Sequence, residues 1–400
     1  MKALLINSAR FVRTPDGKVY SNGQFPYSYW TRYLKHFDTV VLVCRMSNCR
    51  EIPNKWNLSS GPSVTFIGTP DDHNNPLMQL QSGQKLQIIR KQMDDCDAVI
   101  ICQSLLGWLA AREAKKRGIP WAVEVVCDIW DAYWNYGTLL GKLYAPIAWF
   151  DSSYWIRQAD FAKYVTREYL QRRYPCVGVS CGVSDVQINA VSRLIIEQRI
   201  SRWCTTQPNF SKTFVVGMIG SLFTRYKGLH IALHALRKLA NQGIKLQLRV
   251  LGDGNLEVWR QEAKKLRVID SLHLDGCLPS GDPVMKWLDD LDIYIQPSFQ
   301  EGLPRALIEA MSRGLPALGS TCGGIPELLP MECLHHPGDY KTLARQLERM
   351  VLDTFWRIQQ AQRNFSEAQN YYGERVDDRR DVFWHQFIEY VKIKKRHQRR

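Results

Sequence analysis

Short apolar runs alternate with amphipathic stretches along most of this 400-residue chain. In the first half, apolar or β-branched runs lie at 3–7, 39–43 and 98–102, and the segment 105–117 has the spacing of an amphipathic helix. Strands that alternate with helices form parallel sheets, because each connecting helix packs back on a face of the sheet. The alternation therefore predicts an α/β fold in which helices cover both faces of a parallel sheet.

The second half repeats this alternation more regularly, and a polar linker at 205–209 separates it from the first half. A chain of this length exceeds one compact core, since domains average ~150 residues. We therefore expect two Rossmann-like domains, 1–205 and 206–364, and a helical C-terminal extension with a basic tail at 365–400. Ligands of open α/β sheets bind beyond the carboxyl ends of the strands, so two facing sheets would hold a ligand between them.

Several classes of protein are excluded by the distribution of apolar residues and cysteines. The longest stretch without a charged residue, Trp56 to Pro70, is shorter than the ~18–20 apolar residues of a membrane-spanning helix. The apolar start of the chain turns polar at Asn7, too early for the ~7–15 apolar residues of a signal peptide. The 11 cysteines are scattered without zinc-site spacing. We therefore expect a cytoplasmic protein with reduced thiols.

The chain carries 53 basic and 39 acidic residues, a net charge of +14. Such an excess favours polyanionic partners, which are nucleic acid, nucleotide phosphates or anionic lipid. No nucleic-acid-binding motif accompanies the charge, so we expect no nucleic-acid partner. The basic C-terminus is either a solvated, frayed end or a segment that adheres to an anionic membrane face. Its basic residues are Lys392, Lys394, Lys395, Arg396, Arg399 and Arg400.

One segment after an expected strand carries groups suited to a phosphorylated sugar. Glu301 precedes Gly302, Leu303 and Pro304, which open an expected helix that carries Glu309. Pro304 suits a first helical turn, and the free N–H groups of Gly302 and Leu303 would form a positive pole that favours phosphate. A carboxylate such as Glu309 can accept hydrogen bonds from both vicinal hydroxyls of a ribose. Spacing alone also fits a capping glutamate and a surface glutamate on one amphipathic helix.

These residues resemble the Glu-x7-Glu element of retaining glycosyltransferases of family 4, the "glycosyl transferases group 1", which have the GT-B fold. The resemblance extends from Phe214 to Leu329 and rests on the shared order and spacing of individually weak motifs. It implies two Rossmann-like domains whose parallel sheets face a cleft. The matching motifs are Gly220-Ser221-Leu222, Arg225-Tyr226-Lys227-Gly228, Val250–Gly254, His273–Gly276, Gln296-Pro297-Ser298, Gly314-Leu315-Pro316 and Gly323–Glu327.

The resemblance implies roles for individual residues. Lys227 would bind the donor diphosphate, Glu309 would hold the ribose hydroxyls, and Glu301 would contact the donor sugar. The amides of the turn 302–304 would lie against the sugar and the phosphates. Breaking the sugar–phosphate bond builds negative charge on the leaving diphosphate, so fixed cations and amides aimed there would lower the barrier.

The chain departs from the family's pattern at three places. Ser221 stands where the family usually has an arginine, and Arg225 is a candidate to supply that charge. Gly23 lies where the family has a glycine-rich loop near the diphosphate, although an ordinary turn fits equally. The family's histidine near the donor sugar is absent, and Asp128 or Asp131 could instead contact the acceptor hydroxyl or assist its deprotonation. For Asp128, a helix cap is an equal alternative.

The resemblance implies a retaining enzyme that moves a sugar from a nucleoside diphosphate sugar to a saccharide acceptor without a metal or another cofactor. We expect a lipid-linked acceptor at the inner membrane face, in cell-surface polysaccharide or glycan biosynthesis. The main alternative is a non-catalytic GT-B relative that binds nucleotide sugars. A nucleotide-dependent oxidoreductase is excluded, because segment 7–10 lacks the G-x-G-x-x-G that should follow the first strand.

The segment from Tyr133 to Phe150 is dense in aromatic residues. Gly137, Gly141 and Pro146 argue against a long regular helix there, because glycine and proline are poor helix formers. The aromatic side chains either pack in a core or form a surface that meets lipid or stacks on sugar rings.

Overall fold

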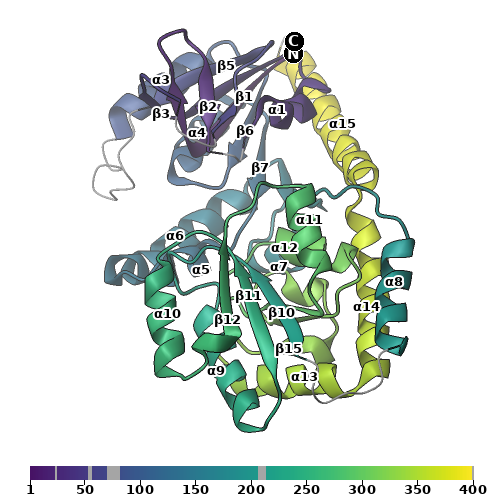
Figure 1. Cartoon of the computed structure of the whole chain (residues 1–400). Helices are drawn as coiled ribbons and strands as arrows, with labels where there is room; N and C mark the ends of the chain where they lie inside the picture. The colour runs from purple at the N-terminus through teal and green to yellow at the C-terminus, as the bar shows by residue number, and fades with distance from the viewer. Residues whose placement is uncertain (23–24, 53–55, 70–81, 206–212, 399–400) are drawn as a thin grey trace.

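The computed structural model of the chain describes residues 1–22, 25–52, 56–69, 82–205 and 213–398. These residues form two domains, each built on a sheet of mainly parallel strands with helices packed around it (Figure 1). In both sheets the chain runs outward from a central strand first in one direction and then in the other. The expected pair of Rossmann-like domains is confirmed.

The N-terminal sheet is built around β1 (Lys2–Arg13). Its parallel strands follow the order β5-β3-β1-β6-β7-β8-β9. The short β2 pairs antiparallel with β1, and β4 pairs antiparallel with β2. Leu4 and Ile6 enter the core on one face of the sheet, and Ala3 and Leu5 enter a separate core on the other face. The other strands are β2 (Val19–Ser21), β3 (Thr39–Asn48), β4 (Asn57–Leu58), β5 (Val64–Thr69), β6 (Ala98–Cys102), β7 (Trp121–Val125), β8 (Phe161–Tyr164) and β9 (Val179–Gly182).

Helix α4 of this domain begins and ends where the sequence supplies caps. The hydroxyl of Ser104 accepts a hydrogen bond from the Gly107 N–H at 3.1 Å and starts α4, which ends at Gly118 with φ +66°. Glycine suits that position because a Cβ disfavours the left-handed region. The helices are α1 (Tyr27–Leu34), α3 (Ser82–Met93), α4 (Leu105–Arg117), α5 (Ile129–Trp134), α6 (Leu139–Arg157) and α7 (Tyr169–Arg173).

Helix α6 contradicts the expectation that glycine and proline interrupt the segment after Tyr133. It runs without a break although Pro146 lies inside it. Thr138 caps its start by accepting a hydrogen bond from the Gly141 N–H at 3.1 Å. A Cβ on Gly141 would lie 2.7 Å from the carbonyl oxygen of Tyr133, so this glycine allows α6 to approach α5. Close packing between the two helices therefore outweighs the hydrogen bond that the proline removes.

The C-terminal sheet is parallel throughout, in the order β12-β11-β10-β13-β14-β15. Because helices cover both faces, its central strands are short apolar runs, and β13 and β14 are buried along their whole length. The strands are β10 (Phe214–Ile219), β11 (Leu246–Leu251), β12 (Leu272–Gly276), β13 (Ile293–Gln296), β14 (Ala317–Ser320) and β15 (Leu334–His335).

The remaining helices follow these strands or link the domains. The α-helices are α8 (Leu194–Thr205), α9 (Leu229–Asn241), α10 (Leu256–Lys265), α11 (Asp282–Asp289), α12 (Arg305–Ser312), α13 (Tyr340–Leu352), α14 (Thr354–Ala368) and α15 (Gly373–Gln398). Short 3-10 turns are η1 (Ile269–Ser271), η2 (Ile325–Glu327), η3 (Met331–Cys333) and η4 (Gln369–Tyr371). In the described part of the chain, no helix has both the length and the apolarity to cross a membrane.

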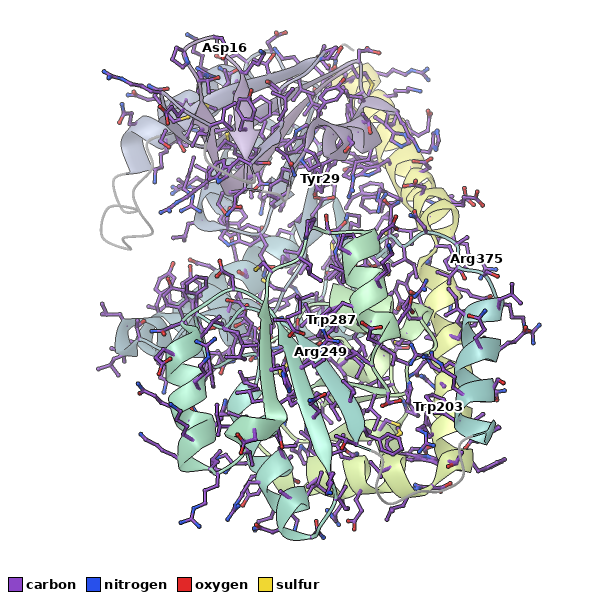
Figure 2. All side chains as sticks on the ribbon, viewed as in Figure 1. Asp16, Tyr29, Trp203, Arg249, Trp287 and Arg375 are labelled. Carbon is purple, nitrogen blue, oxygen red and sulfur yellow. The ribbon has the colours of Figure 1, made fainter. Side chains whose placement is uncertain are left out.

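The packing of α8 differs from the domain bound at 205 that the sequence suggested. Arg199 of α8 is buried and donates to the backbone oxygen of Arg313 in the C-terminal domain at 3.0 Å. Trp203, labelled in Figure 2, forms a small core with Phe365 of α14. Helix α8 therefore belongs to the C-terminal domain, although it precedes the polar linker.

The C-terminal extension expected at 365–400 likewise divides between the domains. Helix α14 begins at Thr354 and packs on the C-terminal domain, whereas α15 returns to the N-terminal domain and ends near the chain's start (Figure 1). Phe383, Trp384 and Phe387 form one apolar face of α15 and are buried against the N-terminal sheet. The aromatic residues of the tail are thus core residues of the first domain.

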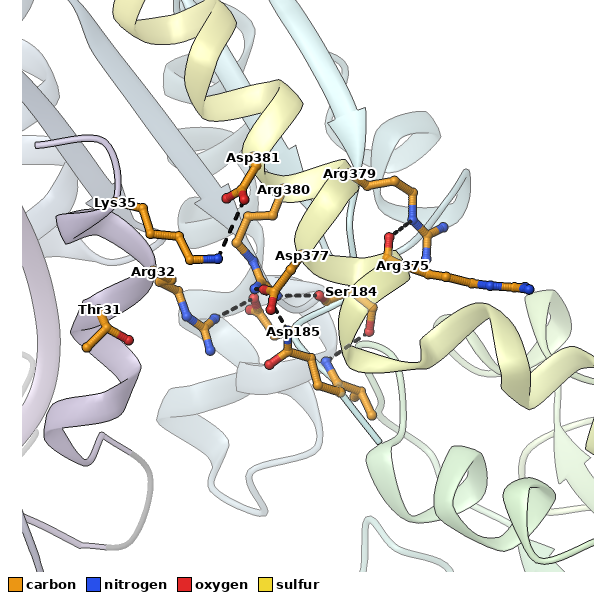
Figure 3. A network of polar contacts seen from close by, with 12 residues as sticks. Thr31, Arg32, Lys35, Ser184, Asp185, Arg375, Asp377, Arg379, Arg380 and Asp381 are labelled. Atoms are coloured by element: carbon orange, nitrogen blue, oxygen red, sulfur yellow. Dashed lines mark hydrogen bonds and ion pairs between the residues drawn. The ribbon is translucent and has the colours of Figure 1, made fainter. Parts of the chain in front are cut away.

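The chain passes between the domains twice, and the two passages are bonded to each other. The Ile188 N–H donates to the Tyr371 oxygen at 3.0 Å, and the Gly373 N–H donates to the Ile188 oxygen at 3.1 Å. Figure 3 shows a polar network beside them, in which Arg380 of α15 donates to the Ser184 oxygen at 3.2 Å. The network joins α1, the first passage and α15 at one place.

Asp185 lies at the centre of this network. It is 2.8 Å from Lys163 and 3.5 Å from Arg32, and Lys163 is also 3.1 Å from Glu124. Lys163 and Glu124 are 1% and 2% exposed. The charges of Lys163 and Arg32 outweigh the burial of Asp185 and lower the pKa of its carboxyl.

Candidate active site

Glu301 follows β13 at the carboxyl end of the C-terminal sheet and is 8% exposed. One carboxylate oxygen, Oε1, accepts hydrogen bonds from Lys227 Nζ at 2.7 Å, Gln296 Nε2 at 2.8 Å and Ser298 Oγ at 2.7 Å. No described residue donates to the other oxygen, Oε2. Charge-assisted bonds therefore fix the carboxylate through one oxygen and leave the second available to a ligand.

Gln296 and Ser298, for which the sequence indicated no role, hold Glu301 in place. The Tyr294 hydroxyl donates to Gln296 Oε1 at 2.8 Å, so the amide must present its NH₂ group to Glu301. The Ile219 N–H at the end of β10 donates in turn to the Tyr294 hydroxyl at 3.3 Å. The Gln-Pro-Ser motif contained the signal, because polar residues at the end of a buried apolar strand need partners.

The loop between β10 and α9 brings Lys227 to Glu301. A Cβ on Gly220 would lie 2.7 Å from Lys227 Cγ, so this glycine leaves room for the lysine side chain. Gly228 has φ +79°, and a Cβ there would lie 1.9 Å from the Pro297 oxygen. The two glycines therefore permit the close approach of this loop to the segment after β13. The structure brings together the two groups that the resemblance assigned to the donor.

Arg225 and Ser221 lie in the same loop but do not contact Glu301. The guanidinium of Arg225 forms two hydrogen bonds with Glu262 of α10, at 2.9 and 2.8 Å, and lies 5.3 Å from the Trp259 ring centroid. The Ser221 hydroxyl accepts a hydrogen bond from the Phe223 N–H at 3.4 Å. Arg225 is thus held by α10 rather than by the carboxylate beside Lys227.

The turn formed by Gly302, Leu303 and Pro304 touches the N-terminal domain. A Cβ on Gly302 would lie 2.2 Å from the Val126 oxygen, and Leu303 packs against the cores of both domains. Pro304 is the cap residue before α12 rather than a member of its first turn. The turn is therefore a contact between domains as well as the start of a helix.

Glu309 lies on α12 in the same polar region as Glu301. Burial raises the pKa of the Glu309 carboxyl, and no described residue donates a hydrogen bond to that carboxyl. The pKa of the Tyr294 hydroxyl is raised first by burial and further by the charges of Glu301 and Glu309. The two glutamates therefore both act on the buried hydroxyl that orients Gln296.

Asp128 is a buried helix cap. It accepts hydrogen bonds from the Trp130 N–H, the Tyr169 hydroxyl and Arg173 Nε, each at 3.0 Å, and also from the Tyr174 hydroxyl. The structure thus bears out the capping alternative for this residue. With both oxygens occupied, Asp128 has little capacity left for an acceptor hydroxyl.

Asp131, three residues further along α5, has a different environment. No described residue donates a hydrogen bond to its carboxylate. Burial, and next the charge of Asp128, raise the pKa of Asp131 to about 6. After burial, the charges of Asp131 and Glu301 both raise the pKa of the Cys322 thiol. Asp131 from the N-terminal domain and Glu301 from the C-terminal domain therefore both lie near enough to Cys322 for their charges to act on its thiol.

Two further predictions concern the glycine loop and metals. Gly23, predicted near the diphosphate, lies outside the described residues. Within the described ranges, no group of three or more His, Cys, Asp or Glu side chains is placed to hold a metal ion.

Comparison with known proteins identifies the family. The family described as "Glycosyl transferases group 1" matches residues 213–353. Protein CapJ of Staphylococcus aureus is 32% identical over 368 residues, which cover 90% of each chain. The chain belongs to the group 1 glycosyltransferases. This group 1 glycosyltransferase is also 35% identical over 137 residues to WcaL of Escherichia coli (strain K12), a protein named for colanic acid biosynthesis. The match covers 31% of this chain and 33% of WcaL.

Solved structures share the fold of this group 1 glycosyltransferase. Sucrose-phosphate synthase from Thermosynechococcus elongatus superposes with a TM-score of 0.67 at 15% identity, covering 98% of this chain and 100% of that chain. Anabaena HepE, solved in complex with UDP and glucose, gives a TM-score of 0.62 at 16% identity, covering 98% and 99%. These likenesses concern the fold alone, and they confirm the expected GT-B architecture.

Proposed function

We propose that this group 1 glycosyltransferase is a retaining enzyme of family 4 that transfers a sugar from a nucleoside diphosphate sugar to a saccharide acceptor. The observation that carries the proposal is the Lys227–Glu301 pair, 2.7 Å apart at the carboxyl end of the C-terminal sheet. That edge is where open α/β sheets bind ligands. The structure of HepE in complex with UDP-glucose supports a donor of this class.

The proposed roles follow from the environment of each group. Lys227 moves from Glu301 to the diphosphate when the donor binds, and its charge offsets the charge that develops on the leaving group. Glu301 receives a donor-sugar hydroxyl on Oε2, the oxygen that no described residue occupies. Glu309 accepts hydrogen bonds from the ribose hydroxyls. These bonds replace the hydrogen bonds with water that the carboxylate loses by being partly buried.

The proposed reaction proceeds on one face of the sugar. The bond from the anomeric carbon to the diphosphate oxygen breaks as a bond from that carbon to the acceptor oxygen forms on the same side. The departing phosphate oxygen takes the proton of the acceptor hydroxyl. Asp131 orients that hydroxyl by accepting its hydrogen bond before transfer, a role for which its unoccupied carboxylate suits it better than the fully bonded Asp128.

The acceptor is proposed to be a lipid-linked saccharide at the inner membrane face, in cell-surface polysaccharide biosynthesis. WcaL is named for colanic acid biosynthesis, and AmsK of Erwinia amylovora for amylovoran biosynthesis. The net charge of +14 would also favour contact with an anionic membrane.

A donor screen tests the proposal. Calorimetric titration with UDP-, GDP- and ADP-hexoses is expected to show binding of one nucleotide class. Glu309→Gln should weaken that binding roughly tenfold, because a hydrogen bond to a charged acceptor is worth more than one to a neutral acceptor. Lys245→Ala, at the opposite end of the sheet, is the control. Absence of binding by every donor would refute the proposal, as would a product whose anomeric configuration, read by proton NMR, is inverted.

The pairing of Arg225 with Glu262 favours a second candidate, because the cation that should replace the family's arginine is held elsewhere. This candidate is a non-catalytic relative that binds nucleotide sugars. It predicts that the donor binds but that no sugar is transferred to an acceptor. Any slow release of sugar from the donor would then be the same in Glu301→Ala as in wild type. A loss of transfer in Glu301→Ala, with the donor still bound, would exclude it.

A further inference from the structure

Helix α6 presents most of its large aliphatic side chains to solvent, whereas its protein-facing side carries small residues and Ile156, with Trp149 and Trp155 partly buried against the core. Leu139 is 74% exposed and Phe150 is 67% exposed. The exposed residues recur every three to four positions, so they form one stripe along the helix. The exposed stripe is Leu139, Leu140, Leu143, Ile147, Phe150 and Tyr154. The buried stripe is Gly141, Ala145, Ala148, Ser152 and Ile156.

An ordinary surface helix turns its large apolar residues toward the core, whereas α6 leaves three leucines, an isoleucine and a phenylalanine exposed. Contiguous exposed apolar side chains of this kind mark interaction sites. Aromatic residues with polar tips lie at both ends of the stripe, at Tyr136 before α6 and Tyr154 near its end, and both are exposed. Such residues are enriched at the interface between membrane lipid and water.

The stripe continues into a groove at the end of α6. The groove has a volume of about 830 Å³ and lies between α6, the edge strand β9 and α15. Tyr154 belongs to both the stripe and the groove, and Val177 and Val179 add exposed apolar side chains beside β9. One carboxylate, Asp160, lies in the lining, where it accepts a hydrogen bond from the Tyr390 hydroxyl at 2.7 Å.

Basic side chains surround the stripe and the groove. The end of α15 lies beside the end of α4, where Gln398 Nε2 donates to the Gly118 oxygen at 3.1 Å, so the basic end of α15 comes close to this surface. Asp151 on α6 is half-buried, and burial raises the pKa of its carboxyl. The exposed basic residues are Lys115, Lys142, Arg157, Lys394 and Arg396.

We propose that α6, the groove and the end of α15 form one docking face for an anionic lipid bilayer. In this arrangement α6 lies in the plane of the interface with its exposed stripe among the acyl chains, and the basic rim contacts lipid phosphates. Charge decides between a bilayer and a second copy of the chain, because two copies meeting through this face would bring their basic rims together. Anionic lipid neutralises the same rim.

This inference rests on the proposed function, because a bilayer would present the acceptor only if the acceptor is a lipid-linked saccharide. The docking face is one short helix away from the candidate active site. Helix α5 packs against α6, and Asn135 at the end of α5 donates to the Phe299 oxygen in the loop before Glu301, at 3.2 Å. A saccharide carried on a lipid at the docking face would therefore reach the candidate active site past α5, the helix that carries Asp131.

Vesicle sedimentation of the full chain, without donor, tests the docking face. The vesicles contain phosphatidylcholine alone or with phosphatidylglycerol. Wild type should bind the anionic vesicles. The double variant Leu143→Gln/Phe150→Gln should lower that binding roughly tenfold or more, because it removes two apolar side chains that would be buried in the bilayer. The control, Leu352→Gln/Phe355→Gln, removes an equally exposed leucine and phenylalanine from the C-terminal domain and should bind as wild type does.

Three outcomes would overturn the docking face. Binding that is unchanged in Leu143→Gln/Phe150→Gln is the first, and equal loss in both double variants is the second. The third is a wild-type dimer, seen by light scattering, that this variant dissociates while no vesicle binds, since a second copy would then cover α6. Thermal unfolding of each variant at the wild-type temperature shows that the fold is intact. Donor binding, measured separately by calorimetry, distinguishes failure of the docking face from failure of the proposed function.

Discussion

Single side chains in the candidate active site are oriented in series. The Ile219 N–H directs the Tyr294 hydroxyl, which directs the Gln296 amide, which contacts Glu301. The Tyr294, Gln296 and Glu301 side chains are buried, so a change in one leaves its neighbour without a partner. The position of Glu301 Oε2 toward a donor sugar is therefore determined by residues that do not touch the donor themselves.

Replacement of Gln296 by methionine is predicted to slow transfer. The side chain keeps about the same volume but loses its three hydrogen bonds, with Tyr294, Ser298 and Glu301. Glu301 therefore loses one of its three donors. Misplacement of a reacting group by a fraction of an ångström to an ångström costs on the order of 10–100-fold in rate, and we expect this loss in kcat rather than in the donor KM. Gln247→Met on β11, where the amide pairs with His273 on an exposed face, is the control for steady-state kinetics. Equal effects in the two variants would contradict the positioning role.

Asp131 predicts a pH dependence of transfer. Burial raises its pKa to about 6, so the carboxyl is neutral below that pH and an anion above it. Only the anion accepts the acceptor's hydroxyl proton in a hydrogen bond through either oxygen, so kcat/KM for the acceptor should rise as pH increases through about 6. Asp131→Asn should flatten this limb of the profile, and Asp128→Asn should instead lower stability. A profile that keeps the same limb in Asp131→Asn would show that another group titrates.

Among helices and strands, the polar network between α1, β8 and α15 predicts a large cost for one substitution. Lys163→Met leaves Glu124 and Asp185 without the cation that lies between them. Removing one partner of a buried ion pair destabilises a fold by about 3–5 kcal/mol. Urea unfolding is expected to show that loss. Lys35→Met, which breaks an exposed pair with Asp381 at 3.5 Å, should change stability by less than about 1 kcal/mol.

Three strands of the second domain could be predicted to the residue, whereas the packing of several helices could not. Segments 214–219, 246–251 and 293–296 each follow a polar residue and end before a glycine or proline, and each is a strand with those bounds. Helix α6 was missed because its glycine and proline are compatible with a helix only through the neighbouring α5. The domain membership of α8 depends on contacts with residues about a hundred positions away.

In the candidate active site, too, some features could be predicted from the sequence and others could not. Lys227 and Glu301 could be found because they lie in ordered motifs of one domain, and the structure places them together. The contact of Gly302 with Val126 could not be found, because it crosses between domains and leaves no local pattern. Arg225 could not be excluded as a neighbour of Glu301 until Glu262 was located beside it.

Across the molecule as a whole, α15 makes the stability of the first domain depend on the far end of the chain. Trp384 is fully buried, 5.5 Å from the Tyr33 ring centroid. Trp384→Ala is expected to lower the unfolding free energy by about 3–5 kcal/mol, and calorimetry should show the loss in the transition that contains the N-terminal sheet. Val382→Ala, an exposed neighbour on α15, should cost less than about 0.5 kcal/mol. A Trp384→Ala protein as stable as wild type would mean that α15 is not part of that core.

The double passage between the domains also limits how they can move. Two covalent connections that are bonded to each other at Ile188 and Tyr371 would allow fewer relative motions of the domains than a single connection would. Such a pair of connections would permit rotation of one domain toward the other, but would resist sliding or twisting of the domains past each other. Opening and closing would then return Asp131 and Glu301 to the same mutual alignment on every cycle.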